Sequence, residues 1–268
     1  MKLKSRAGKG KAGKVTLGRA LSKLGILSRA QALDAIRAGR VRVDGRVLTN
    51  PAALVVPERI RVTVDGETRE RAPWRTILLN KPRGVVTTRR DPAGRRTVFD
   101  LVGDSERGLV AVGRLDLASS GLLLLTSDTR LADWITDPAN GVSRLYVVTA
   151  RGRVDASDLE QLRSGVTREA TRIRAQAIDL RKASARESHL MVELREGKNR
   201  EIRRLFEAIG REVTRLKRVK LGGLELGAVA PGHWREVSAQ EVATAFPGAP
   251  IAGSSASRAF GVQGRRSL

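Results

Sequence analysis

The residues best suited to chemistry lie in a short polar loop, residues 113–121 (GRLDLASSG). The loop carries one carboxylate, Asp116, and one guanidinium, Arg114, between two apolar runs long enough to form buried strands. A rigid scaffold would then present the loop, as it does for many functional groups. A carboxylate placed in this way can act as a nucleophile or as an acid–base catalyst. It can equally serve only as a turn former. The loop by itself leaves both interpretations open.

The remaining composition restricts the chemistry further. The chain has no cysteine and two histidines, His189 and His233. Disulfides, thiolate zinc sites and thiol nucleophiles are therefore excluded, and with them the RNA methyltransferases that add a thiolate to a pyrimidine ring. Residues 8–13 (GKGKAG) match the dinucleotide-binding pattern, but no predicted strand precedes them, so the match is attributed to chance. We expect neither a metal nor a small-molecule cofactor.

The charge balance indicates a polyanionic partner. Fifty-one Lys and Arg against 28 Asp and Glu give a formal net charge of +23 in 268 residues. A surplus of this size favours nucleic acid, with an acidic membrane surface as the competing interpretation. No apolar run of about 18 residues could cross a bilayer, and the basic N-terminus lacks the apolar core of a signal peptide. We therefore expect a cytoplasmic protein without a membrane partner.

Composition divides the chain into two folded parts and three polar segments. Residues 1–14 hold six basic side chains and no acidic one, and residues 247–268 are rich in Gly, Ser and Ala, so both are predicted to be disordered tails. Residues 66–75 are polar and are predicted to be a linker. A small unit is expected over residues 15–65 and a larger one over residues 76–246.

The small unit is predicted to contain two helices and a hairpin. The first helix places three leucines on one face and ends at a glycine: Leu17, Leu21, Leu24 and Gly25. The second helix is expected to start at a capping serine, bury three residues and stop at a glycine: Ser28, Ala32, Leu33, Ile36 and Gly39. Alternating residues 41–47 around Asp44-Gly45 predict the hairpin.

The polar surface of these elements is basic. Six side chains form it: Arg19, Lys23, Arg29, Arg37, Arg40 and Arg42. A solvated helical face is the ordinary explanation of such a charge run. Here little acid balances the cations, which favours contact with phosphate groups.

The larger unit alternates short apolar strands with amphipathic helices. Six segments are predicted to be strands: Ile77–Leu79, Leu109–Val112, Leu122–Thr126, Tyr146–Thr149, His189–Leu194 and Arg215–Leu221. Three are predicted to be helices: Leu131–Ile135, Ala156–Arg163 and Arg200–Ile209. Asp128 and Asp137 are expected at helix ends. The mixture predicts an α+β domain around a mostly antiparallel, mixed sheet flanked by helices.

Two sets of motifs resemble known families. Residues 17–21 (LGRAL), 25–29 (GILSR) and 36–45 (IRAGRVRVDG) resemble the S4 RNA-binding domain over nearly all of the small unit. The GRLD sequence, with the SSG and LLLLT that follow it, resembles the active-site motif of the rRNA pseudouridine synthases, the family of small-subunit synthase A and its large-subunit relatives. Residues 78–85 (LLNKPRGV) and 197–204 (GKNREIRR) resemble the opening and late motifs of that family.

The resemblance implies a role for five residues. Asp116 matches the catalytic Asp, Arg203 the cation that keeps it ionised, and Tyr146 the ring that stacks on the uracil. Arg114 would help to occupy the place of the flipped nucleotide, and Ile202 would pack against the base. Two positions depart from the usual pattern: Leu117 replaces a frequent aromatic residue, and Arg144 replaces a frequent Lys.

The resulting hypothesis is a synthase that isomerises uridine to pseudouridine in ribosomal RNA after flipping the base. The basic tails favour the large-subunit rRNA over the small-subunit rRNA. A non-catalytic S4-type RNA-binding or ribosome-assembly protein is the alternative, although such a protein has no use for an isolated carboxylate in a cationic groove. An S4-linked methyltransferase would need a strand followed by a Gly-rich turn and a helix, which is not apparent. Free rRNA or an assembling subunit is the expected partner, and the resemblance implies a monomer.

Overall fold

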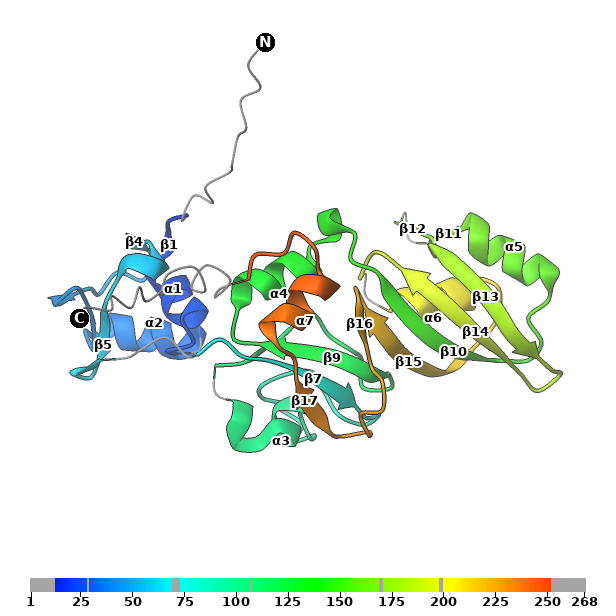
Figure 1. Ribbon diagram of the computed structural model, residues 1–268, viewed down its shortest axis with the longest axis horizontal. Coiled ribbons are helices and arrows are strands. Elements are labelled where there is room, and N and C mark those ends of the chain that lie inside the picture. Colours follow the sequence, from blue (N-terminus) through cyan, green and yellow to red (C-terminus); the bar gives the residue numbers. More distant parts are fainter. Residues whose placement is uncertain are drawn as a thin grey trace, which may run out of the picture. The chain divides into compact units, whose positions relative to one another are not determined.

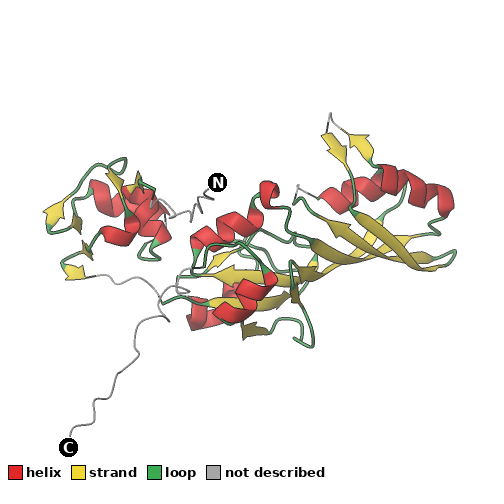
Figure 2. Cartoon of the chain, turned by 45° about the horizontal axis from the view of Figure 1, so that its top comes forward, coloured by secondary structure: helices red, strands yellow, loops and turns green. Residues whose placement is uncertain are grey.

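The chain divides into two compact units, Met1–Pro73 and Trp74–Leu268 (Figures 1 and 2). The structure is a computed structural model that describes residues 13–27, 29–68, 73–106, 108–168, 171–197 and 200–251. The predicted capping residue Ser28 lies outside the described residues, as does most of both predicted tails.

The first unit contains two helices and short strands, as its sequence predicts. Helix α1 spans Leu17–Lys23 and α2 spans Arg29–Arg37, and a 3₁₀ turn, η1, covers Pro57–Arg59. The order in the four-stranded sheet is β3 (Arg46–Val47), β2 (Val41–Val43), β5 (Val62–Val64) and β6 (Glu67–Thr68). A separate pair joins β1 (Val15–Thr16) to β4 (Leu54–Val55).

Two expectations for this region are wrong in detail. Leu33 was expected in the core, but it is 37% exposed, because the buried positions of α2 are Ala32, Ala35 and Ile36 and Leu33 lies at the edge of their stripe. The predicted linker, residues 66–75, includes residues that belong to the two units. Glu67–Thr68 pair with β5, and Trp74 belongs to the second unit.

The described part of the second unit contains a nine-stranded mixed sheet (Figure 1). The main order is β13 (Ala177–Ala183), β14 (Glu187–Leu194), β10 (Arg144–Arg151), β15 (Val213–Leu221), β9 (Ser120–Thr126), β7 (Thr76–Lys81) and β17 (Trp234–Glu236). Two short strands extend it, β16 (Leu224–Glu225) beside β15 and β8 (Val110–Ala111) beside β9. The β9–β15 pair is parallel, and the other strand pairs in the described part of this sheet are antiparallel. A separate hairpin joins β11 (Val166–Arg168) and β12 (Thr171–Ile173).

Helices pack against both faces of this sheet. The described helices are α3 (Val98–Val102), α4 (Thr129–Thr136), α5 (Ala156–Ser164), α6 (Glu201–Glu207) and α7 (Ala239–Ala245), with 3₁₀ turns η2 (Gly103–Glu106) and η3 (Pro138–Asn140). Residues of α3, α5 and α6 contribute to one apolar cluster, and residues of α4 and α7 contribute to another. Side-chain caps mark the starts of α3, α4, α5 and α7 but not of α6, and Asp128 and Asp137 cap α4 and η3 as expected. The predicted α+β class is confirmed.

Strand β9, which follows the polar loop, and its neighbour β7 are buried on both faces. In β9, Leu123 and Leu125 face one apolar cluster, while Leu122 and Leu124 face the other. The same division in β7 separates Ile77 and Leu79 from Leu78. A strand covered on both faces reads as a continuous apolar run, which explains the four consecutive leucines.

Several element boundaries differ from the sequence prediction. Only Val110–Ala111 of the predicted strand 109–112 are paired, and the helix predicted from Arg200 starts at Glu201. The sequence did not predict β13, α3 or α7. At the C-terminal end, Ile251 packs partly buried against an apolar cluster, so the described unit extends beyond residue 246.

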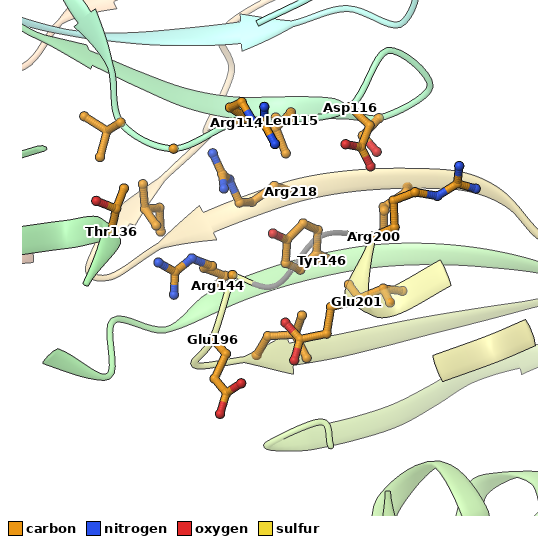
Figure 3. Close-up of a pocket in the computed structure, with 18 of the residues that line it drawn as sticks. Arg114, Leu115, Asp116, Thr136, Arg144, Tyr146, Glu196, Arg200, Glu201 and Arg218 are labelled. Carbon is orange, nitrogen blue, oxygen red and sulfur yellow. The ribbon is translucent and has the colours of Figure 1, made fainter. Parts of the chain in front are cut away.

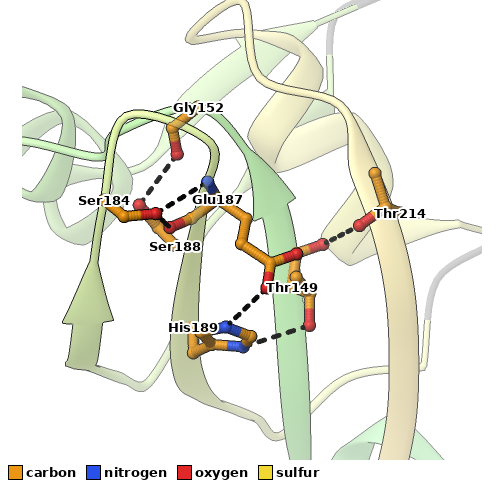
Figure 4. Close-up of polar contacts among 7 residues, drawn as sticks. All are labelled: Thr149, Gly152, Ser184, Glu187, Ser188, His189 and Thr214. Atoms are coloured by element: carbon orange, nitrogen blue, oxygen red, sulfur yellow. Dashed lines mark hydrogen bonds and ion pairs between the residues drawn. The ribbon is translucent and has the colours of Figure 1, made fainter.

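A polar cluster ties together the ends of β10 and β14 (Figure 4). Thr149 Oγ1 lies 3.4 Å from His189 Nδ1, and His189 Nε2 lies 3.1 Å from Glu187 Oε1. Ser188 Oγ donates to the Gly152 carbonyl at 2.9 Å. We call Thr149, Glu187, Ser188 and His189 the His189 cluster.

Among the described residues, no helix is long and apolar enough to span a membrane.

Candidate active site

The polar loop connects β8 to β9 and exposes the Asp116 side chain. The Ser119 N–H donates to the Asp116 backbone carbonyl at 2.9 Å, so the turn is closed by the main chain. Neither carboxylate oxygen of Asp116 accepts a hydrogen bond from a described residue. The carboxylate is therefore not used to form the turn, which is the ordinary role that the sequence left open.

Residues 81–87 hold this loop in place. The Gly84 N–H donates to the Leu117 carbonyl at 2.9 Å. Thr87 Oγ1 donates to the Leu115 carbonyl at 2.9 Å, and the Leu115 N–H donates back to Thr87 Oγ1 at 3.3 Å. The LLNKPRGV motif therefore contributes a clamp on the backbone that carries Asp116.

The strongest part of this clamp is Lys81, which is fully buried. Its Nζ donates to the carbonyl oxygens of Pro82 at 3.0 Å, Asp116 at 3.1 Å and Ser119 at 2.8 Å. Burial lowers the pKa of Lys81 from 10.5 to about 8, and the nearby Asp116 carboxylate opposes this shift by favouring the charged amine. A buried ammonium with three acceptors fixes both ends of the turn.

Asp116 lines a cavity of about 240 Å³ (Figure 3). Arg114, Tyr146 and Ile202 also line it. The structure therefore brings together four of the five residues to which the family resemblance assigns a role. Arg114 is exposed, whereas Tyr146 and Ile202 are 8% and 3% exposed. The cavity continues past Tyr146 toward Arg144 and Thr136.

The sheet register places Tyr146 in the cavity wall. Tyr146 on β10 is paired with Val192 on β14 and with Arg218 on β15. Directly paired residues lie on the same face of a sheet, so the three side chains are neighbours. An irregularity in the pairing falls between Leu145 and Tyr146, where Val219 is the extra residue on β15. Such bulges re-aim side chains and are frequent beside active sites.

Arg203 lies next to the cavity rather than in its wall. Its Nη1 donates to the Val213 carbonyl at 2.6 Å, while its Nη2 is buried without a hydrogen-bond partner among the described residues. Burial lowers the pKa of Arg203, the neighbouring Arg200 lowers it too, and Asp116 raises it. The guanidinium and the Asp116 carboxylate are thus electrostatically coupled, although no ion pair within 4.0 Å joins these two residues in the structure.

Arg200 adds a second cation at the mouth of the cavity. It is the N-cap of α6 and has a φ of 50°, a left-handed conformation that is uncommon for a residue other than glycine. Strained backbone of this kind often occurs at functional sites. Lys198 and Asn199 of the same motif lie outside the described residues.

In the first unit, five of the six predicted RNA-binding side chains are exposed, and Lys23 is half-buried. Arg40 forms an ion pair with Asp65 at 3.1 Å, so this cation does have an acidic partner. Arg42 Nη1 donates to the Gly45 carbonyl at 3.3 Å. Because such exposed contacts are weak, both cations can exchange them for a phosphate group.

Three residues of the site were missed by the sequence reasoning: Lys81, Arg200 and Arg218. Lys81 and Arg200 lie within motifs whose resemblance was noted, but nothing in their spacing shows that they converge on Asp116. Arg218 lies in a strand with three further cations, Arg215, Lys217 and Lys220, and no sequence signal separates it from them.

The cavity holds a carboxylate without a hydrogen-bond partner among the described residues, next to guanidinium groups and an aromatic ring. Because the chain is strongly basic, this site is typical of an enzyme that acts on RNA. The model of the RNA pseudouridylate synthase family matches residues 75–208, and the S4 domain model matches residues 17–59. The chain belongs to the RNA pseudouridylate synthase family and carries an S4 domain. The family match covers the unit that holds Asp116, so the alternative of a non-catalytic S4 protein is wrong.

Individual relatives agree with this assignment. An uncharacterized RNA pseudouridine synthase of Aquifex aeolicus (strain VF5) is 34% identical over 233 residues, which cover 87% of this chain and 94% of that protein. The ribosomal large subunit pseudouridine synthase B of Salmonella typhi is 38% identical over 229 residues, covering 82% and 78%. A crystal structure of a pseudouridylate synthase superposes with a TM-score of 0.60 at 25% identity, covering 85% of this chain and 98% of that one.

Proposed function

We propose that this chain converts a uridine of large-subunit ribosomal RNA to pseudouridine, with Asp116 as the catalytic carboxylate. The observation that carries the proposal is the Asp116 side chain, which faces a cavity without a hydrogen-bond partner among the described residues while Lys81 fixes its backbone. The large-subunit target is supported by the Salmonella typhi relative, whose name states that substrate. Small-subunit rRNA is the second candidate target.

The reaction needs one bond to break and another to form at the same sugar carbon. The C1′–N1 bond of the uridine breaks, and its electron pair leaves with the uracil. Asp116 compensates at the sugar, either by bonding to C1′ or by removing a proton from C2′. The uracil turns and C5 bonds to C1′, while the Asp116–C1′ bond breaks or the C2′ proton is returned. The hydrogen of C5 then leaves as a proton, and N1 gains a proton. The reaction has no net redox change, and the carboxylate suffices without a metal or cofactor.

We assign roles in this reaction to four residues around Asp116. The base must leave the RNA stack, and Arg114, exposed at the cavity, is placed to occupy the vacated space. Tyr146 would stack on the flipped uracil and Ile202 would pack against it. Arg203 would attract the Asp116 carboxylate electrostatically and help to keep it directed toward the substrate.

The basic S4 unit would bind the rRNA around the target through phosphate contacts. We further propose that the chain acts as a monomer in the cytoplasm, where an rRNA substrate, free or in an assembling subunit, would be available to it.

The proposal is tested by mapping pseudouridine in both rRNAs from cells with and without the gene, using carbodiimide labelling and primer extension. Loss of one site in the large-subunit rRNA is the expected result. A lost site in the small-subunit rRNA would correct the target. An unchanged pattern in both rRNAs would contradict the proposal.

A further inference from the structure

Arg218 on β15 is a buried cation whose hydrogen-bonding capacity is mostly unused. It is 3% exposed and lines the same cavity as Asp116. Its Nε donates to the Leu122 carbonyl at 2.7 Å. Nη2 is buried without a partner, and no hydrogen bond from Nη1 is formed to a described residue. A buried guanidinium that leaves donors unpaired is costly, which calls for an explanation.

Arg144 in the same cavity wall shows what a purely structural guanidinium looks like. It is 6% exposed. Its Nη1 donates to the carbonyls of Val142 at 2.7 Å and Arg195 at 3.0 Å, and its Nη2 donates to the Ile135 carbonyl at 3.1 Å. Arg144 therefore ties loops together, and the contrast implies that the free donors of Arg218 serve something that is not part of the chain.

The backbone around Arg218 holds it firmly against the catalytic loop. Arg218 is paired with Gly121 across the parallel β9–β15 contact. A Cβ atom at Gly121 would collide with the Arg218 carbonyl, so the glycine that ends the GRLDLASSG loop is needed for this close approach. The strand that holds Arg218 is therefore packed directly against the end of the loop that holds Asp116.

The position of Arg218 in the cavity indicates which part of a substrate it meets. Figure 3 shows Asp116 at one end of the labelled residues, Arg144 and Thr136 at the other, and Arg218 beside Tyr146 between them. Arg218 and Tyr146 are also direct partners in the sheet. If the sugar lies at Asp116 and the uracil lies on Tyr146, as the proposed function requires, the far edge of the base points toward Arg218.

We propose that Arg218 donates a hydrogen bond to a carbonyl oxygen of the flipped uracil and stabilises the negative charge on that oxygen as the C1′–N1 bond breaks. The electron pair of that bond passes to N1 and is delocalised onto O2 and O4. Formation of the C1′–C5 bond then removes this charge, and the C5 proton is lost as N1 gains a proton. A fixed donor in a site screened from water stabilises such charge strongly.

The depth of Arg218 favours the base over an RNA phosphate as its partner. Phosphate groups remain near the surface of a bound RNA, where the exposed Arg114 and Arg200 lie at this cavity. A flipped base is the part of the substrate that enters deepest, and both Arg218 and its neighbour Tyr146 are nearly inaccessible.

The test pairs changes in the enzyme with changes in the substrate. Single-turnover pseudouridine formation is measured by nucleoside analysis of an rRNA fragment that carries uridine, 2-thiouridine or 4-thiouridine at the target, because sulfur is a weaker hydrogen-bond acceptor than oxygen. The enzymes are wild type, Arg218→Met, Arg218→Lys and the matched control Arg144→Met. A fourth RNA has a methylphosphonate beside the target uridine. Fragment binding and Tm are measured for every variant.

We expect one thio substitution to slow the wild type about 10-fold or more, consistent with loss of a hydrogen bond to a charged group. Arg218→Met should be roughly 10²–10³-fold slower on uridine, the loss typical of a removed oxyanion donor, and insensitive to that thio substitution. Arg218→Lys should fall between the two, which provides the answer if Arg218→Met does not fold. Arg144→Met should keep the thio effect while lowering Tm.

Two results would overturn the inference. Arg218 variants that keep the full thio effect would show that the residue is only structural. Variants that instead become insensitive to the methylphosphonate would assign Arg218 to a phosphate. Neither result touches the proposed function, which has a separate readout in this experiment: pseudouridine formation by the wild type in the unmodified fragment.

Discussion

Two polar groups of residues that each include part of β10 differ in how many of their side chains form hydrogen bonds. In the His189 cluster, a hydroxyl, an imidazole and a carboxylate lie in contact, the same group types that form a catalytic relay in many hydrolases (Figure 4). Their polar atoms are bonded to one another, and Thr149 is buried. At the Asp116 cavity, by contrast, the carboxylate, Arg218 in the cavity wall and Arg203 beside the cavity retain unused hydrogen-bonding capacity.

The difference shows that residue types alone do not mark a reactive site. The His189 cluster lies outside the lining of the Asp116 cavity and stabilises the ends of two strands. The Asp116 cavity keeps unpaired charges next to space that a substrate can fill. Preorganised charges without a partner in the free protein are the usual source of transition-state stabilisation.

The largest loss of activity is expected when Asp116 is replaced. Asp116→Asn should reduce single-turnover pseudouridine formation by roughly 10⁴-fold or more, because the amide can neither attack C1′ nor accept a proton. The unfolding free energy should change by less than about 0.5 kcal/mol, since the exposed carboxylate makes no hydrogen bond to a described residue. Wild-type turnover by this variant would mean that another carboxylate does the chemistry.

Arg203 is the next most sensitive position. Arg203→Met should slow product formation about 10²-fold, because the cation coupled to Asp116 is removed. Arg203→Lys is the control and should recover part of the rate. Product formation by Arg203→Met at the wild-type rate would contradict this role.

Replacement of the aromatic ring should have a smaller effect. Tyr146→Leu should lose about 10- to 100-fold in activity, because stacking of one base on a ring contributes about 1–3 kcal/mol. Tyr146→Phe keeps the ring and should remain within a few-fold of the wild type. Equal losses in both variants would show that the hydroxyl, rather than the ring, is what matters.

The titration of Lys81 should make the unfolding free energy rise and the activity fall as the pH increases. Its pKa of about 8 in the folded chain lies below the ordinary 10.5. The folded state therefore loses this proton first, and between about pH 8 and 10.5 the unfolded state binds more protons. Relative to Lys81→Met, the unfolding free energy of the wild type should rise across that window by at most about 3 kcal/mol. The burial penalty is fully present below pH 8.

The activity of the wild type should fall as pH rises through about 8. A neutral amine has two N–H donors for the three carbonyl oxygens of Pro82, Asp116 and Ser119, so the Asp116 loop is held less firmly. Lys81→Met should be slower at every pH and should lack this fall. Denaturant titrations and single-turnover rates from pH 7 to 10.5 measure both effects. A wild-type stability that is flat relative to the variant would contradict the assigned pKa.

The smallest effect is expected in the His189 cluster. His189→Gln should leave pseudouridine formation within about 2-fold of the wild type and lower the unfolding free energy by about 1 kcal/mol, the typical value of a lost hydrogen bond. Kinetics and denaturant titrations with the same rRNA fragment test both statements. A large loss of activity without a loss of stability would move this cluster into the catalytic machinery.

The sequence was informative where local pattern decides the structure. Period and turn chemistry located β7, β9, β10 and α4, and the motifs led to Asp116. Leu33 was misplaced because one helical stripe admits two neighbouring assignments, and tertiary packing chose Ala35. Lys81 and Arg218 were missed because their roles arise from non-local contacts. Lys81 meets a loop 35 residues away, and Arg218 meets Leu122 across 96 residues.

The central claim is that the Asp116 carboxylate carries out the chemistry of this enzyme. The most direct test maps pseudouridine in the rRNA of cells whose own gene is deleted and replaced by the wild-type gene or by Asp116→Asn, at equal protein levels. We expect the wild-type gene to restore the lost pseudouridine and the Asp116→Asn gene to restore none. A restored pseudouridine in the Asp116→Asn cells would contradict the central claim.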